Sequence, residues 1–515
     1  MYDAIVIGAG ISGCSVAREL SRYELKCLVL EKGHDIAAGT TRGNSATVHA
    51  GYDPEPGSNK AIYNVRGSRM YGELCRELNV PYMKNGMIIF AVNSEQMDEC
   101  RRLKATGDLN GVATELCDRP RLLEIEPDMG EGVIGGLWVP DSGMVSPYEL
   151  CFALSENAAM NGVEFRRGSE VTAIEPLIGG WRVTAGEERF ETKYLFNCAG
   201  THADIFNNMV SKDKFRIIPR EGQHLILDRE LQSYVKTTIC QTPEKLPGGG
   251  HTKGMGIMPS VDGSIILGCN ADDVEDRNFS DTTAEGMAKI VDYFEEKWKY
   301  LPISKKYPDF PRDKVITAYG GSRPHPDRDD FILGEPEDAK GFINLAGIES
   351  PGVTAAPAIA IDMVKILVER EGPALKADYR PGREIKKPFR DMTDAQRAEA
   401  IAKDADYAKL VCRCEQVTVA EVRDAIRRPN GARSISGVKM RTRAGMGRCQ
   451  GGFCSTRVLE ILAEELGLSP LEVRQSGRGS EILLGRAAMG GGICPSSTAS
   501  GPPSPQGEGR KEEIR

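Results

Sequence analysis

The stretch YDAIVIGAGISGCSVARELSRYELKCLVLEK, residues 2–32, decides the fold of this 515-residue chain. Its apolar opening predicts a β-strand, SVARELSR predicts a helix, and KCLVLEK predicts a second strand. Gly8, Gly10 and Gly13 lie between the first strand and the helix in the pattern G-x-G-x-x-G. In this context the first glycine allows a tight turn, the second lets the backbone approach a pyrophosphate, and the third lets helix and strand pack closely.

The second strand ends at Glu31, whose carboxylate can accept hydrogen bonds from ribose hydroxyls. This favours an adenosine without a 2′-phosphate. The glycines of GEGVIGG, residues 130–136, also fit the pattern, but they follow EIEPDM rather than a strand, and we interpret them as loop glycines. Because the chain has one such strand–helix–strand unit, we predict that it holds FAD as a resident cofactor.

Composition excludes several classes of protein. The formal net charge of −8 argues against a nucleic-acid-binding protein, which needs a basic face. Hydrophobic residues make up 40% and charged residues 27%, which predicts a globular protein of about two to four domains. No apolar run reaches the ~20 residues that cross a bilayer, since Asp362 and Lys365 interrupt the longest candidate, 355–368. With no signal-peptide pattern before the first strand, we expect a cytoplasmic protein.

The order of predicted elements indicates an interleaved arrangement. The fold class that we predict is α/β, with a discontinuous Rossmann-like FAD-binding domain interleaved with a β-rich α+β substrate domain, plus a small helical C-terminal domain. The expected FAD-binding parts are about 1–80, 145–215 and 325–371, within an oxidoreductase unit of 1–371. The expected substrate parts are about 81–144 and 216–324, followed by a linker at 372–407, the small domain at 408–475 and a disordered tail at 490–515.

Four of the fourteen cysteines are clustered. Cys412 and Cys414 form C-x-C, and Cys449 and Cys454 form C-x4-C. In a reducing compartment such a set indicates a metal site rather than disulfides. Four thiolates from two short, glycine-rich loops suit a [2Fe–2S] cluster. A structural zinc is the alternative, although zinc sites favour C-x2–4-C spacings, and unbound thiols are a third interpretation.

Three segments together resemble the D-amino-acid-oxidase-like FAD oxidoreductases. They are the opening fingerprint, TTRGNSATVHAGYDPEPGSNKA (40–61) and LAGIESPGVTAAPAIA (345–360). Within that family the resemblance is to the branch of glycerol-3-phosphate dehydrogenases and oxidases and L-2-hydroxyglutarate oxidases, and it covers roughly residues 1–370. In addition, CRCEQVT (412–418) and RTRAGMGRCQGGFC (441–454) are similar to the ferredoxin-like [2Fe–2S] module of the anaerobic glycerol-3-phosphate dehydrogenase catalytic subunit.

The resemblance implies a reaction. It implies FAD-dependent oxidation of sn-glycerol 3-phosphate, a small anionic substrate, to dihydroxyacetone phosphate. Hydride would go to flavin N5, and electrons would leave through the [2Fe–2S] cluster to an external acceptor. A redox subunit that accepts the electrons is the implied partner, and the chain would be cytoplasmic or peripheral to the inner membrane face through that partner. The alternative is a dehydrogenase for L-2-hydroxyglutarate or another 2-hydroxy acid, and amine oxidation ranks third.

The resemblance also assigns site residues. His49 closes an N-S-x-x-x-H motif and is the implied base for the substrate hydroxyl, as an imidazole suits. Its other interpretation is a strand histidine satisfied by backbone. The implied catalytic and substrate-binding residues are His49, Arg323, Lys253, Ser45 and Ser350. The implied cofactor-binding residues are Gly8, Gly10, Gly13, Glu31, Lys32, Thr41, Asn44, Ser45, Val171, Ala199, Gly200, Gly347, Gly352, Val353 and Thr354. This chain departs from the family's N-S-G-V-I-H, because it has N-S-A-T-V-H.

Overall fold

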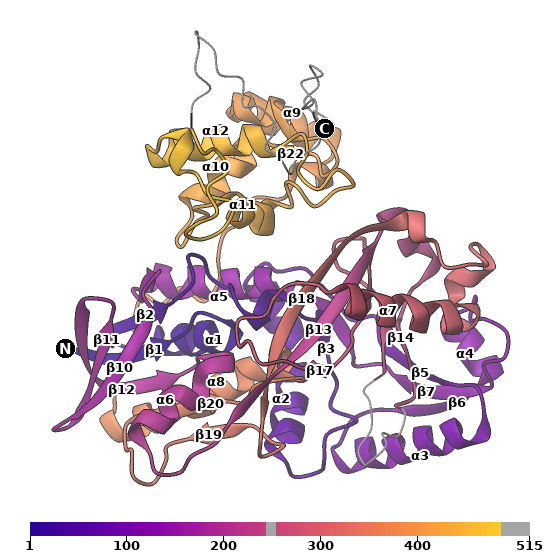
Figure 1. Ribbon diagram of the computed structural model, residues 1–515, viewed down its shortest axis with the longest axis horizontal. Helices are drawn as coiled ribbons and strands as arrows, with labels where there is room; N and C mark the ends of the chain where they lie inside the picture. Colours follow the sequence, from indigo (N-terminus) through magenta and orange to yellow (C-terminus); the bar gives the residue numbers. More distant parts are fainter. Residues whose placement is uncertain (244–253, 486–515) are drawn as a thin grey trace, which may run out of the picture.

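The computed structural model describes residues 1–243 and 254–485, so Lys253 and the predicted tail at 490–515 lie outside the described residues. A sheet of eight strands forms one half of the main body, by which we mean residues 1–371 (Figure 1). Its strand order is β10-β11-β12-β1-β2-β9, and β20 pairs with both β12 and β19. The strands are β1 (Tyr2–Ile7), β2 (Cys27–Glu31), β9 (Glu164–Arg167), β10 (Val171–Leu177), β11 (Gly180–Ala185), β12 (Glu188–Asn197), β19 (Ile332–Gly334) and β20 (Phe342–Ala346).

Alternation along β1 decides what covers each face of this sheet. Ala4 and Val6 pack in a core with four helices on one face, whereas Ile5 and Ile7 pack with β10, β11 and a fifth helix on the other. All four side chains are buried, so both faces of the sheet are covered, as parallel sheets require. The helices on the first face are α1 (Ile11–Leu20), α2 (Asn59–Glu77), α5 (Pro147–Met160) and α8 (Gly352–Glu371), and the fifth helix is α6 (Ala203–Val210).

A second sheet of nine strands forms the other half of the main body (Figure 1). Its strand order is β17-β13-β16-β15-β14-β5-β7-β6, and β18 pairs along the length of β13. These strands are β5 (Met87–Ala91), β6 (Glu115–Asp118), β7 (Gly135–Val139), β13 (Ile217–Leu227), β14 (Thr238–Gln241), β15 (Gly256–Pro259), β16 (Ile265–Gly268), β17 (Asp272–Asp273) and β18 (Val315–Pro326). Its core includes side chains of α4 (Arg119–Ile125) and α7 (Ala284–Lys297), while α3 (Ser94–Leu109) covers β5 and β7.

A small three-stranded sheet connects the two halves. It consists of β3 (Thr47–Val48), β4 (Tyr82–Met83) and β8 (Gly143–Val145), in the order β3-β8-β4. Because β3 directly precedes His49, this sheet fixes the backbone that carries the N-S-x-x-x-H motif. The apolar run at 355–368 lies within α8 and packs in the core of the first half. Among the described residues, no helix has the length and apolar character needed to cross a membrane.

The C-terminal unit, residues 408–475, has a core of its own (Figure 1). It contains β21 (Leu410–Cys412), β22 (Val417–Thr418), α10 (Val419–Arg427), α11 (Ile435–Thr442) and α12 (Ser455–Leu466). A capping box between Thr418 and Glu421 begins α10. The segment at 372–407 contains one α-helix, α9 (Asp394–Lys403), and α11 contacts α5 of the main body. The exact domain boundaries given above stay a prediction.

Candidate functional site

The carboxyl ends of parallel strands meet at one edge of the first sheet, because β12, β1 and β2 lie side by side and β20 extends the row beyond β12. Gly8 follows β1, Glu31 ends β2, Ala199 and Gly200 follow β12, and Gly347 follows β20. Open α/β sheets bind ligands at this edge. The fold therefore gathers five of the residues that the resemblance assigns to the cofactor.

The glycine turn leaves no room for side chains. Gly8 has φ +97°, and a Cβ there would lie 2.6 Å from the carbonyl oxygen of Cys198. A Cβ on Gly13 would lie 1.9 Å from the carbonyl oxygen of Gly8. Gly10 is the N-cap residue of α1 and has no side chain to cap the helix, and the first turn has no acidic residue. This helix end therefore suits a bound anion such as a pyrophosphate.

The loop after β2 is hydrogen-bonded to that helix end. Thr41 Oγ1 accepts a hydrogen bond from the N–H of Ile11 (2.9 Å), and Asn44 Nδ2 donates to the carbonyl oxygen of Thr41 (2.6 Å). Between them lies Arg42, which the sequence interpretation missed. Arg42 is half-buried and has no ion pair within residues 1–243 and 254–485, and burial lowers its pKa. A cation without a carboxylate partner in this loop fits a pyrophosphate as its counter-charge.

Glu31 and Lys32 lie at the end of β2, beside which a dinucleotide fold binds the adenosine ribose. The buried Glu31 carboxylate accepts hydrogen bonds from the N–H groups of Ala9 and Gly33 (2.6 Å each). Burial raises the pKa of Glu31 in spite of these two bonds. Lys32 Nζ donates to Asn278 Oδ1 (2.5 Å). Contacts with the backbone of Ala9 and Gly33 therefore position Glu31, and a contact with the distant Asn278 positions Lys32.

The remaining predicted cofactor residues are brought to the same edge. The N–H of Ser169 bonds to the carbonyl oxygen of Glu31 (2.8 Å), which places the start of β10, Val171, near β2. Gly352, Val353 and Thr354 form the first turn of α8. Thr354 Oγ1 accepts a hydrogen bond from the N–H of His49 (3.0 Å). This bond joins the N-S-x-x-x-H motif to the helix turn.

The predicted substrate residues Ser45 and Arg323 meet at a cysteine that the sequence interpretation missed. Arg323 Nη2 donates to Cys269 Sγ and to the carbonyl oxygen of Asn270 (2.8 Å each). Ser45 Oγ lies 3.7 Å from Cys269 Sγ and 3.0 Å from His224 Nε2. These side chains come from β18, β16–β17 and β13, together with the loop before β3. The second sheet therefore supplies a cation and hydrogen-bonding groups next to the N-S-x-x-x-H motif.

His224 and Tyr319 stack on one another next to Ser45, Cys269 and Arg323. His224 is buried, and its ring stacks on Tyr319 with centroids 4.6 Å apart. The Tyr319 hydroxyl donates to the carbonyl oxygen of Asn44 (2.9 Å). The β13–β18 register, which pairs His224 with Tyr319, sets this arrangement. It ties the second sheet to the loop that carries Asn44 and Ser45.

Cys269 is expected to react as a thiolate at neutral pH. Burial would raise its pKa, but Arg323 and His224 outweigh burial and lower it to about 5. We expect alkylation of Cys269 by iodoacetamide, followed by peptide mass spectrometry, to have a nearly constant rate from pH 6.5 to 8.5. Cys240 in β14 is the control, because burial raises its pKa to about 12 and its rate should climb with pH. A Cys269 rate that climbs in parallel with that of Cys240 would contradict the assignment.

The other two predicted substrate residues are Ser350 and Lys253. Ser350 immediately precedes Pro351, the N-cap residue of α8. Its neighbour Glu349 accepts from Lys60 Nζ (2.8 Å) and lies 3.0 Å from His325 Nδ1. Burial would raise the pKa of Glu349, but His325 and Lys60 lower it to about 2. Lys253 lies outside the described residues, so its predicted role has no structural counterpart here.

The four clustered cysteines come together in the C-terminal unit. Cys414 Sγ lies 4.0 Å from Cys449 Sγ, and Cys412 and Cys454 interact as a second pair. A Cβ on Gly447 would lie 2.2 Å from the Cβ of Cys414, so the two loops pack closely. In the part of the chain that the structure describes, no group of three or more potential ligands is arranged around a single metal ion. The thiols gather instead as two pairs, an arrangement that suits two iron atoms.

The cysteine loops are docked on the main body through ion pairs. Arg448, next to Cys449, bonds to Asp228 and lies 2.9 Å from Glu230. Glu415, next to Cys414, is buried. Its carboxylate accepts from Arg443 (2.8 Å) and Arg390 (2.9 Å) and lies 3.5 Å from Arg229 of the main body. The cysteine set therefore lies beside loops of the second sheet.

Comparisons with known proteins identify the two modules. Residues 3–366 match the FAD dependent oxidoreductase family, and residues 410–464 match the BFD-like [2Fe-2S] binding domain. The chain belongs to the FAD-dependent oxidoreductase family. It is 42% identical to a glycerol 3-phosphate dehydrogenase of Caloramator mitchellensis, over 94% of this chain and 98% of that protein. It is 24% identical to one component of the anaerobic glycerol-3-phosphate dehydrogenase of Escherichia coli, over 89% of this chain and 88% of that one.

A solved structure supports the fold. The dithionite-reduced L-alpha-glycerophosphate oxidase of Mycoplasma pneumoniae, with FAD bound, aligns with a TM-score of 0.68 and 26% identity. The alignment covers 75% of this chain and 99% of that one. The predicted family, fold class and cofactors, FAD and a [2Fe–2S] cluster, are thereby confirmed. The N-terminus of α1 without an acidic residue in its first turn, the packed glycine turn and Arg42 fit FAD, and the paired thiols fit the cluster.

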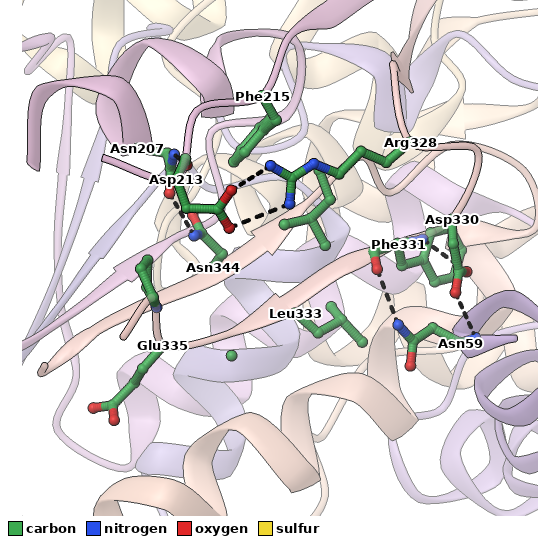
Figure 2. A pocket seen from close by; sticks show the side chains of 13 residues that line it. Asn59, Asn207, Asp213, Phe215, Arg328, Asp330, Phe331, Leu333, Glu335 and Asn344 are labelled. Carbon is green, nitrogen blue, oxygen red and sulfur yellow. Dashed lines mark hydrogen bonds and ion pairs between the residues drawn. The ribbon is translucent and has the colours of Figure 1, made fainter. Parts of the chain in front are cut away.

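A separate cavity of about 310 Å³ lies near β19, away from the Cys269 group (Figure 2). Its arginine, Arg328, is held by Asp213 at 2.5 and 3.2 Å. Asn59 donates through its side chain to the carbonyl oxygen of Phe331 (3.0 Å), and its N–H donates to Asp330 (2.9 Å). Since its arginine already has a carboxylate partner, this cavity offers no free cation for an anionic substrate among the residues that the structure describes.

Proposed function

We propose that this protein is an FAD-dependent sn-glycerol-3-phosphate dehydrogenase that passes electrons through its C-terminal [2Fe–2S] cluster to an external electron-accepting protein. The observation that carries the proposal is the relative in Caloramator mitchellensis. That glycerol 3-phosphate dehydrogenase matches this chain over nearly the whole length of both proteins, through both modules. The cation-containing group of Ser45 and Arg323 suits a phosphate-bearing substrate.

FAD, when bound, supplies a hydride acceptor. The residues proposed to hold it are the three glycines of the turn, Glu31, Thr41, Asn44 and the first turn of α8. His49 would take the proton from the substrate hydroxyl, because a carbinol gives up hydride only as its oxygen loses a proton. The backbone of His49 is fixed on both sides. Its N–H bonds to Thr354, and its carbonyl oxygen accepts from the Asn64 amide (2.8 Å).

Arg323 is proposed to bind the phosphate as a planar fork. Its guanidinium donates to Cys269 Sγ and to the carbonyl oxygen of Asn270, so it is not a lone buried charge. Ser45, Ser350 and Lys253 are proposed as further contacts to the substrate. The direction of the Arg323 side chain depends on its immediate neighbours, among them Gly222 on β13.

Substituting alanine for Gly222 should displace Arg323. A Cβ on Gly222 would lie 2.6 Å from Arg323 Nη2, and the flexible guanidinium would have to move. Losing one charge-assisted hydrogen bond costs about 1.5–3 kcal/mol, so we expect KM for glycerol 3-phosphate to rise by about tenfold or more. Steady-state kinetics check this. Gly72→Ala is the control, because a Cβ there meets nothing within 4 Å. Equal KM values for the two variants would contradict the role of Arg323.

Electron exit is proposed at the exposed side of the cysteine loops. Cys414 is exposed, and Phe453, next to Cys454, is 89% exposed. The cluster, when bound, supplies one-electron transfer. Arg448 and Glu415 make the ion pairs to the main body, whereas Cys414 and Phe453 stay open to a partner.

An anaerobic substrate titration tests the proposed function. Addition of glycerol 3-phosphate to the cluster-replete protein should bleach the flavin absorbance, and the cluster absorbance should follow. L-2-Hydroxyglutarate is the second arm, because an L-2-hydroxyglutarate dehydrogenase of Caenorhabditis elegans is 31% identical to this chain over 52% of its length. Bleaching by L-2-hydroxyglutarate but not by glycerol 3-phosphate would overturn the proposal in favour of the 2-hydroxy acid.

A further inference from the structure

A cavity of about 480 Å³ lies between the main body and the C-terminal unit. One wall comes from the main body, at the end of β9 and in the loop after β2. The other wall comes from two loops of the C-terminal unit, before α11 and after α12. The side chains that matter for the argument are His34, Arg166, Arg167, Arg433, Arg474 and Ser476.

The lining of this cavity contains four arginines and, among the described residues, no carboxylate. The cavity in Figure 2 differs, because its lining includes Asp213, Asp330 and Glu335 beside its arginine. Acidic partners outside the lining neutralise two of the four arginines. Arg166 pairs with Glu164 (2.7 Å), and Arg474 pairs with Glu481 (2.9 Å). Arg167 and Arg433 do not have an acidic partner of their own in this way.

Arg167 and Arg433 are short of negative charge. Arg433 makes no ion pair with a described residue, and its Nη1 donates to the carbonyl oxygens of Ile426 (2.8 Å) and Ala432 (2.9 Å). Arg167 lies 3.4 Å from Asp35, but that carboxylate already accepts two 2.7 Å bonds from Arg441. Arg167 and Arg441 therefore share one carboxylate. Desolvation and the neighbouring Arg441 lower the pKa of Arg433, although its side chain is exposed and Asp35 acts in the opposite direction.

We propose that this cavity binds a phosphate-bearing anion that bridges the main body and the C-terminal unit. Guanidinium groups present planar forks that match phosphate oxygens, and Arg167 and Arg433 approach from opposite walls. The volume exceeds that of a single phosphate, so it can accept a ligand with two phosphate groups or with an organic part against Phe165. The site is separate from the substrate group at Arg323.

A bridging anion should hold the C-terminal unit on the main body. Arg441 and Asp35 already join the two parts, but Arg167 and Arg433 repel one another across that bond. An anion between them would replace repulsion with attraction on both walls. The docked position of the cysteine loops would then be stabilised by a ligand that takes no part in the chemistry.

Calorimetry with inorganic pyrophosphate tests the site. The protein is titrated with both cofactors loaded, so that FAD fills the pyrophosphate site of the glycine turn, in a low-salt buffer free of phosphate. We expect one saturable site per chain and a higher melting temperature. Arg433→Ala should weaken binding at least tenfold. Arg433→Lys, which keeps the charge but removes the fork, should weaken it less, and it serves if the alanine variant folds poorly.

The matched control is Arg328→Ala, since Arg328 has its own carboxylate partner in the cavity of Figure 2. This variant should bind pyrophosphate as the unmodified protein does. Absence of a saturable site, or binding by Arg433→Ala within twofold of the unmodified protein, would overturn the proposal. Loss of binding in Arg323→Ala would overturn it as well, because the anion would then occupy the substrate group. None of these outcomes depends on glycerol 3-phosphate being the substrate.

Discussion

Replacing His49 by asparagine is expected to lower the rate of flavin reduction by glycerol 3-phosphate by about 10²- to 10⁴-fold, the usual contribution of a general base. Asparagine cannot take up the hydroxyl proton, so hydride departure would leave a protonated carbonyl oxygen. The backbone bond to Thr354 does not involve the imidazole and should survive. Stopped-flow measurement of flavin bleaching under anaerobic conditions gives the rate directly.

The control for this variant is His34→Asn. His34 lines the cavity between the main body and the C-terminal unit, away from the Ser45 and Arg323 group. Its flavin reduction rate should equal that of the unmodified protein. Flavin content and melting temperature separate the two interpretations of His49. A structural histidine predicts lost stability with a nearly normal rate per bound flavin, and that result would remove His49 from the mechanism.

Local patterns were sufficient for the parts of the fold that depend on neighbouring residues. The spacing of Gly8, Gly10 and Gly13 predicts the turn, because a side chain on Gly13 would meet the backbone of Gly8 within the same strand–helix unit. The C-x-C and C-x4-C spacings predict the clustered thiols for the same reason. The unbroken apolar run of β1 predicts a strand that is buried on both faces, and its successive side chains do pack in two different cores. The contacts that join these motifs to other parts of the chain, Gly8 with Cys198 and Cys414 with Cys449, are not local.

The residues that sequence reasoning missed depend on strand register. Cys269 meets Arg323 because β16 and β18 both pair with β13, and no local pattern specifies that register. His224 reaches Ser45 across 179 residues. Arg42 lies inside a segment that the sequence singles out, but only the structure shows that it lacks an ion pair among the described residues. The sequence could have indicated Arg42 as a phosphate-binding residue, since it is the one basic residue between Thr41 and Asn44.

Replacing Cys449 by serine is expected to abolish electron transfer to an external acceptor while flavin reduction by glycerol 3-phosphate stays within about threefold of the unmodified rate. Cys449 is half-buried and its Sγ lies 4.0 Å from that of Cys414, so its loss leaves one pair of the proposed cluster ligands incomplete. Serine is a poor iron ligand beside thiolates, because iron–sulfur clusters favour soft sulfur donors. Iron content, the visible spectrum of the cluster and turnover with a one-electron dye measure the three consequences.

The design separates a relay from a structural role. Cys117→Ser is the matched control, since Cys117 is buried in β6 of the second sheet, far along the chain from the C-terminal unit, and its thiol contacts the carbonyl oxygen of Glu115. It should keep both iron and turnover. The docking ion pairs of Arg448 and Glu415 do not involve the Cys449 thiol, so the C-terminal unit should stay attached in Cys449→Ser. Full turnover with the physiological acceptor in a variant that has lost its iron would show that electrons leave the flavin by another route, and the cluster would then be a structural element.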